Sequence, residues 1–366
     1  MAEETINPSN EATFDEVLFE KRGRLGVVTL NRPKAVNALT EPMVVAMREQ
    51  LEAWADDDDV QTVLVRGAGD RGLCAGGDIV AIYDDMLRGG NITANFWAAE
   101  YRLNLLISRY RKPYVAFMDG LVLGGGVGVS AHGSVRVVTE RTRTGMPETT
   151  IGFAPDVGGT LLLSGSPGES GTHAALTATH LDGADALFLG LADHFVPSEQ
   201  LDALAAALED EAAETAVGRF AEQAPPSALA TQQRWIDECY AADDAEEIVA
   251  RLRSAGGEAA QAAETIEAKS PTSVKVTLEA LRRARGLSLA EVLDQDYRVG
   301  LHCLRGPDFR EGIRAQVVDK DRNPQWRPAT LSEVTDDDVA RYFEWLGERE
   351  LGLAGADAVR GAAKRH

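Results

Sequence analysis

The sequence is poor in cysteine, in basic residues and in long apolar segments. Its 366 residues include three cysteines, and 58 Asp+Glu outnumber 37 Lys+Arg to give a formal net charge of −21. Three cysteines are too few for a disulfide framework, which predicts a reduced, cytoplasmic protein. The acidic balance argues against partners such as nucleic acid or an anionic membrane. An anionic small ligand at a local site is still compatible with it.

No targeting or membrane-spanning segment is predicted. The stretch from Met1 to Glu20 is acidic and lacks an apolar centre, unlike a signal or transit peptide. The stretch from Tyr114 to Gly133 has few charges, but glycines interrupt it and it contains Asp119 and His132. A strand, a glycine turn and a buried helix explain it better than a membrane span.

Strand and helix signals alternate along the chain as far as about residue 200. Strands are predicted at 25–30, 62–66, 114–118 and 135–139, and helices beginning near 40 and 78 and spanning roughly 95–110. This alternation indicates βαβ units and a mainly parallel sheet. Beyond residue 200 the sequence is typical of Ala-, Glu- and Arg-rich helices. We therefore expect a leader (1–20), a core containing the active site (21–225), a helical C-terminal region (226–350) and a flexible tail (351–366).

Several common functional motifs are absent or incomplete. The chain has no Walker A loop, and its six histidines are dispersed without a His-Glu-x-x-His motif, so no metal site is predicted. The segment 126–131 fits Gly-x-Gly-x-x-Ala, but the acidic residue of a dinucleotide site is not evident, which disfavours an oxidoreductase. Ser130 misses the nucleophile-elbow pattern. Cys74 is better explained as a small buried thiol than as a nucleophile.

Two glycine loops carry a stronger signal. They are Cys74-Ala-Gly-Gly-Asp78 and Leu123-Gly-Gly-Gly-Val-Gly128, and each follows a predicted strand and opens onto a helix. Such junctions expose backbone N–H groups that favour negative charge, and glycine lets a ligand oxygen approach closely. Side by side, the loops would form an oxyanion hole with two donors. Tight packing of helix on strand is the alternative for either loop alone.

Two carboxylates follow the second loop. Glu148 lies in Met146-Pro-Glu148, and Asp156 lies in Pro155-Asp-Val-Gly-Gly159. A carboxyl group in an apolar, glycine-rich setting can have a raised pKa and act as an acid or a base. The alternatives are a solvated loop end for Glu148 and a helix N-cap for Asp156.

The ordered set of motifs resembles the crotonases, the enoyl-CoA hydratase/isomerase superfamily. The chain is most similar to one branch, the 3-hydroxyisobutyryl-CoA hydrolases, and the resemblance covers about residues 15 to 350. It implies an α/β fold with a ClpP/crotonase-like ββα spiral core and a helical C-terminal region. The motifs shared with the superfamily are Leu30-Asn-Arg-Pro-Lys-Ala-Val-Asn-Ala-Leu39, Cys74-Ala-Gly-Gly-Asp-Ile79, Lys112-Pro-Tyr-Val-Ala116, Gly124-Gly-Gly-Val-Gly128, Met146-Pro-Glu148 and Pro155-Asp-Val-Gly-Gly159. Those shared with the branch are His194-Phe-Val-Pro, Ser270-Pro-Thr-Ser, Phe309-Arg-Glu-Gly-Ile-Arg314 and Asp319-Lys-Asp-Arg-Asn-Pro324.

The resemblance also implies roles for individual residues. The backbone N–H groups of Gly77 and Gly125 would hold the carbonyl oxygen of an acyl-CoA thioester. Hydratases use two glutamates, of which the later matches Glu148 and the earlier falls at Gly128, which has no side chain. The hydrolase branch instead pairs a glutamate at Glu148 with an aspartate at Asp156. The substrate-binding residues implied by that branch are Glu100, Gly125, Glu148 and Asp156.

The predicted function is therefore hydrolysis of an acyl-CoA thioester, with 3-hydroxyisobutyryl-CoA of valine catabolism as the substrate. Glu148 would attack the carbonyl to give a mixed anhydride or would activate water, and Asp156 would position the substrate hydroxyl and assist proton transfer. Coenzyme A would enter as part of the substrate, with no other cofactor and no metal. By the same resemblance, its nucleotide would lie near Lys34, Ala35, Val36, Ala75 and Gly76.

Alternatives remain at this point. An enoyl-CoA hydratase or isomerase is disfavoured by Gly128, and a non-catalytic CoA-binding protein by the retained carboxylates and glycine loops. Crotonases commonly form homo-oligomers, either trimers or hexamers, and the resemblance implies that assembly without requiring it.

Overall fold

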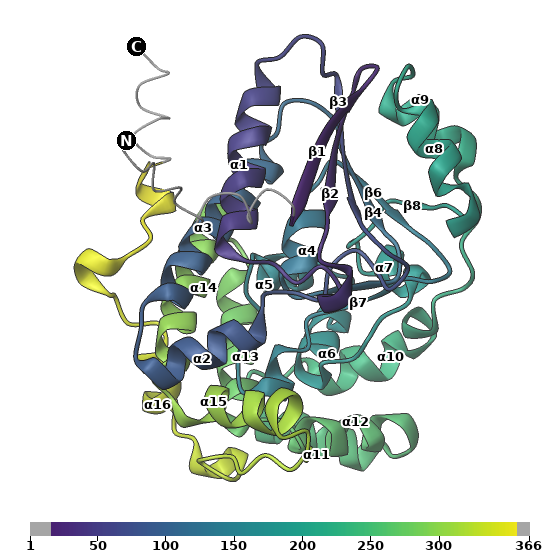
Figure 1. Cartoon of the computed structure of the whole chain (residues 1–366). Coiled ribbons are helices and arrows are strands. Elements are labelled where there is room, and N and C mark those ends of the chain that lie inside the picture. The colour runs from purple at the N-terminus through teal and green to yellow at the C-terminus, as the bar shows by residue number, and fades with distance from the viewer. Residues whose placement is uncertain (1–15, 357–366) are drawn as a thin grey trace, which may run out of the picture.

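A six-stranded sheet forms the centre of the protein, whose computed structural model describes residues 16–356 (Figure 1). The strand order is β1-β2-β3-β4-β6-β8, with β1 and β2 antiparallel and all other neighbours parallel. The strands are β1 Val17–Arg22, β2 Leu25–Leu30, β3 Thr62–Gly67, β4 Tyr114–Met118, β6 Val135–Val138 and β8 His194–Phe195. The expected parallel sheet and its four predicted strands are confirmed, with small differences at their ends.

The two faces of the sheet bury different layers because side chains alternate along each strand. On β3 and β4, Val63, Val65 and Ala116 face a large core, whereas Leu64 and Val115 face a smaller one. Helices α8 (Leu201–Ala207) and α9 (Ala213–Phe220) cover the smaller side. The sheet is therefore buried on both faces, as parallel sheets generally are.

The large core is covered by helices that flank the sheet and by those of the C-terminal region. Helix α1 starts where the sequence predicts, because Thr40 caps it by accepting from the Met43 N–H, and Pro42 lies in its first turn. The helices on this side and below it are α1 Glu41–Ala55, α2 Ile79–Arg88, α3 Ile92–Ser108, α4 Gly125–Ser130, α5 Gly159–Ser164, α6 Ser170–Thr177, α7 Gly183–Phe188, α10 Ala228–Tyr240, α11 Ala245–Ala255, α12 Gly257–Glu267, α13 Pro271–Ala284, α14 Leu289–Cys303, α15 Pro307–Ile313 and α16 Asp336–Arg341.

A second, two-stranded sheet brings the two glycine loops together. Its strands, β5 (Leu121–Leu123) and β7 (Arg143–Gly145), are parallel and too short to be recognised in the sequence. Cys74 forms an isolated parallel bridge with Val122, and its N–H donates to the carbonyl of Leu121. The first glycine loop is thereby hydrogen-bonded alongside the strand that leads into the second.

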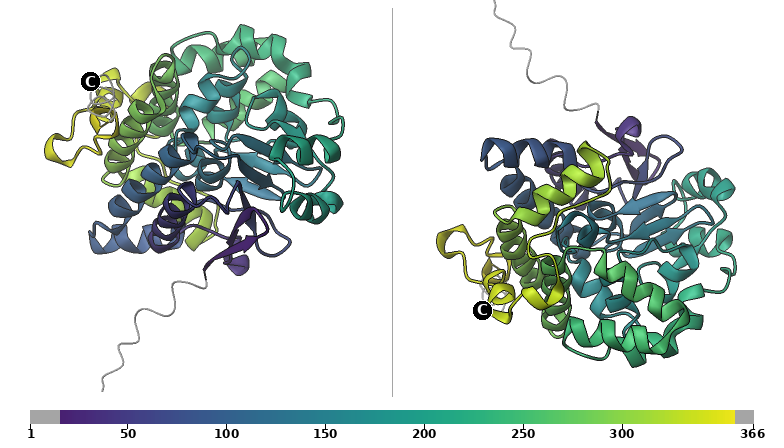
Figure 2. Two further views of the ribbon diagram at one scale, coloured as in Figure 1. Left: turned by 90° about the horizontal axis from the view of Figure 1, so that it is seen from above. Right: turned by 90° about the horizontal axis from the view of Figure 1, so that it is seen from below.

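The C-terminal helices pack against the early part of the chain. In both views of Figure 2 the light-green helices lie beside the blue α2–α3 segment, and α14 contacts α3 while α15 contacts α2. Buried residues from both ends of the chain, such as Met43 and Phe309, belong to one hydrophobic cluster. Most of the region expected over 226–350 is helical, and it shares its core with the sheet.

The expected terminal segments differ in part from the structure. Residues 1–15 of the leader and 357–366 of the tail lie outside the described residues. The end of the expected leader, from Val17, is already strand β1. The start of the expected tail is held in place, because the N–H groups of Leu353 and Ala354 donate to the Asp294 carboxylate at 2.8 and 3.0 Å. Of the helices within residues 16–356, none is long and apolar enough to cross a membrane.

Asn37 ties the turn after β2 to the first glycine loop. Its amide oxygen accepts from the Arg32 N–H at 2.9 Å, and its amide nitrogen donates to the carbonyls of Ala68 and Gly72 at 3.0 Å each. The residue is fully buried and has a φ of 55°, a left-handed conformation that asparagine tolerates better than most residues.

Asn37→Ala should destabilise the protein by about 3 kcal/mol, because it leaves three buried backbone groups without partners. Asn37→Asp keeps the shape but cannot donate to the two carbonyls, so it should cost at least as much. Chemical denaturation measures both, with the exposed Asn95→Ala as a control expected to change little. Wild-type stability of Asn37→Asp would show that the donated bonds contribute nothing.

Candidate active site

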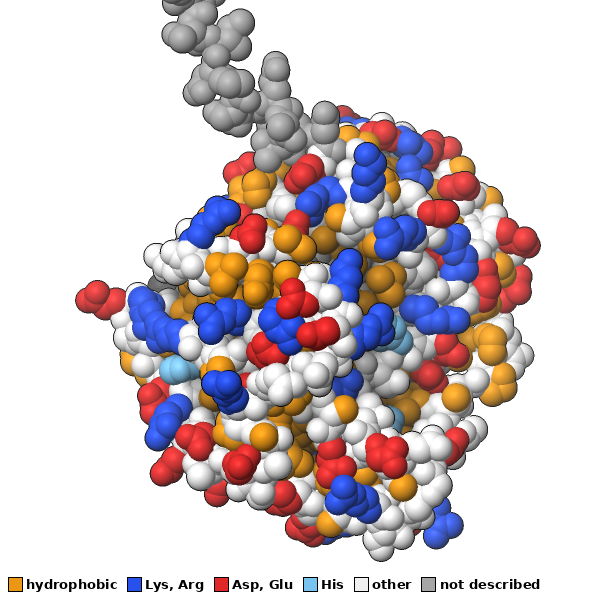
Figure 3. Space-filling view, turned by 60° about the horizontal axis from the view of Figure 1, so that its bottom comes forward, with side chains coloured by type: hydrophobic (Ala, Val, Ile, Leu, Met, Phe, Trp, Pro, Cys, Tyr) orange, Lys and Arg blue, Asp and Glu red, His pale blue; other side chains and the backbone are white. Residues whose placement is uncertain are grey.

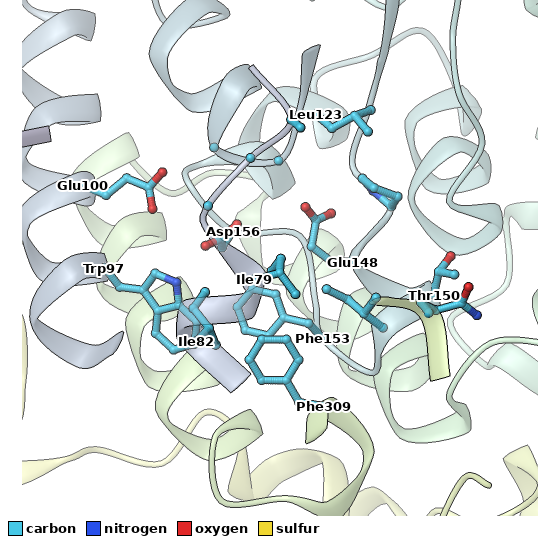
Figure 4. Close-up of a pocket in the computed structure, with 18 of the residues that line it drawn as sticks. Ile79, Ile82, Trp97, Glu100, Leu123, Glu148, Thr150, Phe153, Asp156 and Phe309 are labelled. Carbon is cyan, nitrogen blue, oxygen red and sulfur yellow. The ribbon is translucent and has the colours of Figure 1, made fainter. Parts of the chain in front are cut away.

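The two glycine loops border a cavity of about 220 Å³ (Figure 4). Its walls come from the loops, from α2 and α3, from the segment after β7 and from the C-terminal region. The lining residues are Ala75, Gly76, Gly77, Ile79, Ile82, Phe96, Trp97, Glu100, Leu123, Gly124, Gly125, Pro147, Glu148, Thr150, Ile151, Phe153, Asp156, Phe309 and Gln316. All of the predicted catalytic and oxyanion residues thus meet in one place.

Two backbone N–H groups are available at this cavity. The two residues that flank Gly77 are both hydrogen-bonded to Leu39. The Leu39 N–H donates to the carbonyl of Gly76 at 2.8 Å, and the Asp78 N–H donates to the carbonyl of Leu39 at 3.0 Å. Gly125 is the first residue of α4, so its N–H has no partner within the helix. Among the described residues, neither N–H donates to a protein acceptor. The pair can therefore act as an oxyanion hole.

Close packing explains why these positions are glycine. A Cβ on Gly125 would overlap the Glu100 carboxylate and lie 3.4 Å from the Gly77 nitrogen. A Cβ on Gly124, whose φ is 50°, would lie 2.9 Å from Glu148 Oε1. The start of α4 is thus in direct contact with two carboxylates. The glycines of these loops therefore serve close packing, and they also leave room for a ligand beside the free N–H groups.

Three carboxyl groups face this cavity, from Glu100 on α3, Glu148 at the start of the 3-10 helix η2 (Glu148–Ile151), and Asp156. All three are buried. Within residues 16–356, Glu100 Oε1 and Glu148 Oε2 have no hydrogen-bond partner. Acceptors that are buried without a partner are costly, and they point to a site that is completed by a ligand or by a proton.

The environment raises the pKa of all three groups. Burial is the main cause for each. The charge of Asp156 raises the pKa of Glu100 and Glu148 further, and Glu148 also acts on Glu100. The pKa of Asp156 rises to about 7, against the opposing effect of a hydrogen bond from Tyr101. The cluster therefore holds protons near neutral pH and can both donate and accept them.

The turn that carries Asp156 is held by three side chains that no sequence motif marks as part of the site. The Tyr101 hydroxyl donates to Asp156 Oδ2 at 2.7 Å. His132 Nε2 lies 2.7 Å from the carbonyl of Val157, and Asp296 Oδ2 accepts from the Gly158 N–H at 2.8 Å. Val157 has a φ of 51°, which is strained for a β-branched residue.

Two of the alternative interpretations from the sequence are wrong. Asp156 is not a helix N-cap, because α5 begins at Gly159 with Gly158 as its cap. Glu148 is not a solvated loop end, since it is only 6% exposed.

Gly128 lies where a hydratase would carry its first glutamate. A Cβ at this position would lie 2.8 Å from the Val157 Cβ and 2.9 Å from Asn104 Nδ2. Asn104 is fully buried, and its amide atoms have no partner among the described residues. The space needed for a second glutamate is therefore occupied by other side chains.

The C-terminal region packs against η2 through close backbone contacts. A Cβ on Gly312 of α15 would overlap the carbonyl of Ile151, and a Cβ on Gly152 would overlap the carbonyl of Asp308. The Ser270 hydroxyl donates to Asp308 Oδ2 at 2.6 Å, and the Ser270 N–H donates to the carbonyl of Thr149. The active site therefore depends on residues well outside the expected core of 21–225.

The residues predicted to bind the CoA nucleotide are only partly brought to the cavity. Ala75 and Gly76 line it, and the Ala75 N–H donates to the carbonyl of Val36 at 2.9 Å. Lys34 and Ala35 are exposed, in the 3-10 turn Pro33–Ala35, and do not line the cavity. Their role in nucleotide binding stays a prediction. In residues 16–356, no group of three or more His, Cys, Asp or Glu side chains is arranged to hold a metal ion.

The parallel sheet, the paired glycine loops and the two available amides define a scaffold that can stabilise the oxyanion of a thioester. The chain belongs to the enoyl-CoA hydratase/isomerase family, whose pattern matches residues 25–343. This confirms the resemblance and the fold class predicted from the sequence.

Relatives and solved structures cover nearly the whole chain. It is 42% identical over 350 residues to a protein of Danio rerio named 3-hydroxyisobutyryl-CoA hydrolase, mitochondrial, covering 92% of each. The human protein of the same name is 40% identical, covering 92% of this chain and 90% of its own.

Two crystal structures share the fold closely. One, of a carnitinyl-CoA dehydratase from Mycobacterium thermoresistibile, has a TM-score of 0.90 at 51% identity and covers 93% of this chain and 100% of its own. The other, of an enoyl-CoA hydratase from Rhodobacter sphaeroides 2.4.1, has a TM-score of 0.87 at 38% identity, covering 92% and 99%.

The raised pKa of Asp156 predicts how stability depends on pH. The group titrates near 3.8 when unperturbed and at about 7 when folded, so the folded protein keeps a proton that the unfolded chain loses. The stability that this proton confers is lost as the pH rises from the pKa of the unfolded chain to that of the folded protein. Asp156→Asn does not titrate, so it should gain about 2 kcal/mol relative to wild type between about pH 5 and pH 7.

Urea denaturation at the two pH values measures this difference. The exposed Asn95→Ala variant, which changes no titratable group, should show a constant offset from wild type. A constant offset for Asp156→Asn as well would contradict the raised pKa.

The packing around Gly128 predicts a contrast between two glycines in helices. Gly128→Ala should destabilise by about 1–3 kcal/mol, because its Cβ overpacks against Val157 and Asn104. Gly218→Ala on α9 meets nothing within 4 Å and should stabilise by about 0.5–1 kcal/mol through helix propensity. Thermal unfolding of both variants provides the comparison, and equal effects would show that the space beside Gly128 is not closed.

Proposed function

We propose that this protein hydrolyses acyl-CoA thioesters, with 3-hydroxyisobutyryl-CoA as its substrate and 3-hydroxyisobutyrate and CoA as products. The observation that carries the proposal is the buried pair Glu148 and Asp156 beside the two amides, with no side chain at Gly128. The relatives named as hydrolases of this substrate support it, at about 40% identity over most of the chain. Valine catabolism is the pathway in which we place the reaction.

The geometry supports one role for the backbone amides, which would stabilise the oxyanion, and another for Glu148, which would supply or activate the nucleophile. The substrate carbonyl oxygen would accept from the N–H groups of Gly77 and Gly125, which would stabilise the oxyanion as it forms. Removing one such donor typically costs about 3–4 kcal/mol of transition-state stabilisation. Glu148, ionised, would attack the carbonyl carbon or take a proton from a water that does so. The C–S bond then breaks and the sulfur leaves as a thiolate, which gives the free acid directly when water is the nucleophile. When Glu148 attacks, a mixed anhydride between Glu148 and the acyl group remains, and water hydrolyses it to release the acid and restore the Glu148 carboxylate.

Asp156 would supply the complementary proton. Burial raises the pKa of Asp156 to about 7 and also raises the pKa of Glu148, so the pair shares protons near neutral pH. The reactive form would be the one with the proton on Asp156 and Glu148 ionised. Asp156 could donate this proton to the leaving sulfur or to the substrate hydroxyl through a hydrogen bond. Glu100, whose carboxylate lies beside Gly125, would accept from the substrate hydroxyl with its unpartnered oxygen.

Binding of coenzyme A requires local positive charge in an acidic protein. Figure 3 shows Lys and Arg side chains gathered in a band across one face, despite the net charge of −21. Such a surface suits the phosphates of coenzyme A, which the reaction needs only as part of the substrate.

We propose the cytoplasm as the location, because the three cysteines are buried and free, as in a reducing compartment. The names of the animal relatives assign those proteins to mitochondria.

Hydration or dehydration is the competing function, since the two crystal structures described above carry those names. Adding or removing water across a carbon–carbon double bond with two glutamates would need the second one near Gly128, where Val157 and Asn104 fill the space. The site therefore favours attack at the carbonyl carbon.

Glu148→Gln should reduce hydrolysis by about 10²–10⁴-fold, because the amide can neither attack nor accept a proton. The measurement is thiol release, followed with a thiol-reactive dye, from 3-hydroxyisobutyryl-CoA and 3-hydroxypropionyl-CoA. Loss of the enoyl absorbance of crotonyl-CoA is followed in parallel as the hydratase assay.

Glu140→Gln, on the surface, is the matched control and should keep the wild-type rate. Hydrolysis by Glu148→Gln at the wild-type rate would overturn the assigned role. Hydration of crotonyl-CoA without thiol release by the wild-type protein would overturn the proposed function.

A further inference from the structure

Three aromatic rings form one wall of the cavity. Trp97 of α3 stacks on Phe153 with ring centroids 5.1 Å apart, and Phe153 stacks on Phe309 of α15 at 4.7 Å. The centroids of Trp97 and Phe309 are 6.3 Å apart, and the three ring planes lie within 25° of one another. All three side chains are buried and line the cavity, as Figure 4 shows.

The position of Phe309 is rigidly determined. Gly152, with a φ of 72°, lets α15 approach so closely that a Cβ there would lie 2.8 Å from the Phe309 nitrogen. Gly312, one turn further along α15, makes the same kind of contact with Ile151. Backbone packs on backbone at both points, with no flexible side chain between. The backbone that carries the ring therefore cannot move away without undocking the helix.

The cavity is small for a ligand site. Pockets for drug-sized ligands usually measure about 300–1,000 Å³, against about 220 Å³ here. The oxyanion amides and the carboxylates occupy one part of its lining, and the stacked rings close another (Figure 4). An acyl group whose carbonyl reaches Gly77 and Gly125 therefore has little room before it meets the rings.

We propose that Phe309 sets the upper limit on the acyl chain, which restricts the enzyme to CoA thioesters of short acyl groups of about four carbons. The inference rests on the proposed function and names the feature that selects among its substrates. Phe309 is a specificity-determining residue, contributed by the C-terminal region to a site whose reacting groups come from the core. Because ring and chain compete for the same space, truncating the ring should admit longer chains.

The size of the effect follows from how hydrophobic pockets discriminate. One methylene more or less is worth about 10–200-fold in kcat/KM. Phe309→Ala should therefore raise the kcat/KM for 3-hydroxyhexanoyl-CoA relative to that for 3-hydroxyisobutyryl-CoA by at least about 10-fold. Phe309→Leu should shift the ratio in the same direction by less, because it keeps most of the apolar bulk.

The experiment presents both substrates to each variant in one reaction and quantifies the two acids released. A ratio measured in competition does not depend on how much enzyme is folded, so partial unfolding of Phe309→Ala does not obscure it. Phe343→Ala is the matched control. This ring also belongs to the C-terminal region, where it packs against Arg283 with 4.1 Å from the guanidinium carbon to the ring centroid, and it does not line the cavity.

A shift towards the six-carbon substrate in the Phe309 variants, absent in Phe343→Ala, supports the proposal. An unchanged ratio in both Phe309 variants overturns it, and if Phe309→Ala does not fold, Phe309→Leu alone decides. Efficient cleavage of the six-carbon thioester by the wild type also overturns it. If the wild type cleaves neither thioester, the proposed function fails instead, so the two failures are distinguishable.

Discussion

Glu100, Glu148 and Asp156 bury three carboxyl groups in one cavity, beside two backbone amides that have no protein acceptor. Burial of this kind costs free energy unless protons or partners compensate, and the raised pKa values express that cost. The three carboxyl groups would destabilise an ordinary core, but in this cavity the same burial lets them exchange protons near neutral pH. The rest of the structure keeps them close together and keeps the amides directed at the same space.

Close backbone contact is the means by which the fold achieves this. The glycines at the start of α4 bring the two amides next to each other, because a Cβ on Gly124 or Gly125 would strike a carboxylate and one on Gly126 would strike the first loop at Cys74. Gly152 and Gly312 dock α15 onto the turn that carries Glu148 in the same way. The strained turn after Asp156 is held by His132 and Asp296, which lie 25 and 138 residues from the groups they contact. The C-terminal region is therefore part of the active site.

Much of the core architecture could be predicted because its signals are local. The runs at 25–30 and 114–118 are apolar, rich in β-branched or aromatic residues and bounded by turn residues, and both are strands with the predicted bounds. Strand β1 was missed because it lies at the sheet edge, where exposed charged residues such as Lys21 hide its pattern. Strands β5 and β7 have only three residues each, which is too few for a periodicity.

The residues of the candidate site were also predictable from the sequence only in part. The ordered set of motifs, through the family that it resembles, was enough to predict Gly77, Gly125, Glu148 and Asp156 as site residues, although each segment alone also fits a structural role. Nothing local marks Tyr101 or Asp296, and Phe309 begins a motif shared with the hydrolase branch that gives no sign of a place in the cavity. All three reach the site from helices packed against it. The sequence by itself determined the class of fold and the chemical groups available for catalysis. Only the tertiary structure decided which groups share protons, which space is closed at Gly128 and which side chains line the cavity, because burial and steric contact arise between segments far apart in the chain.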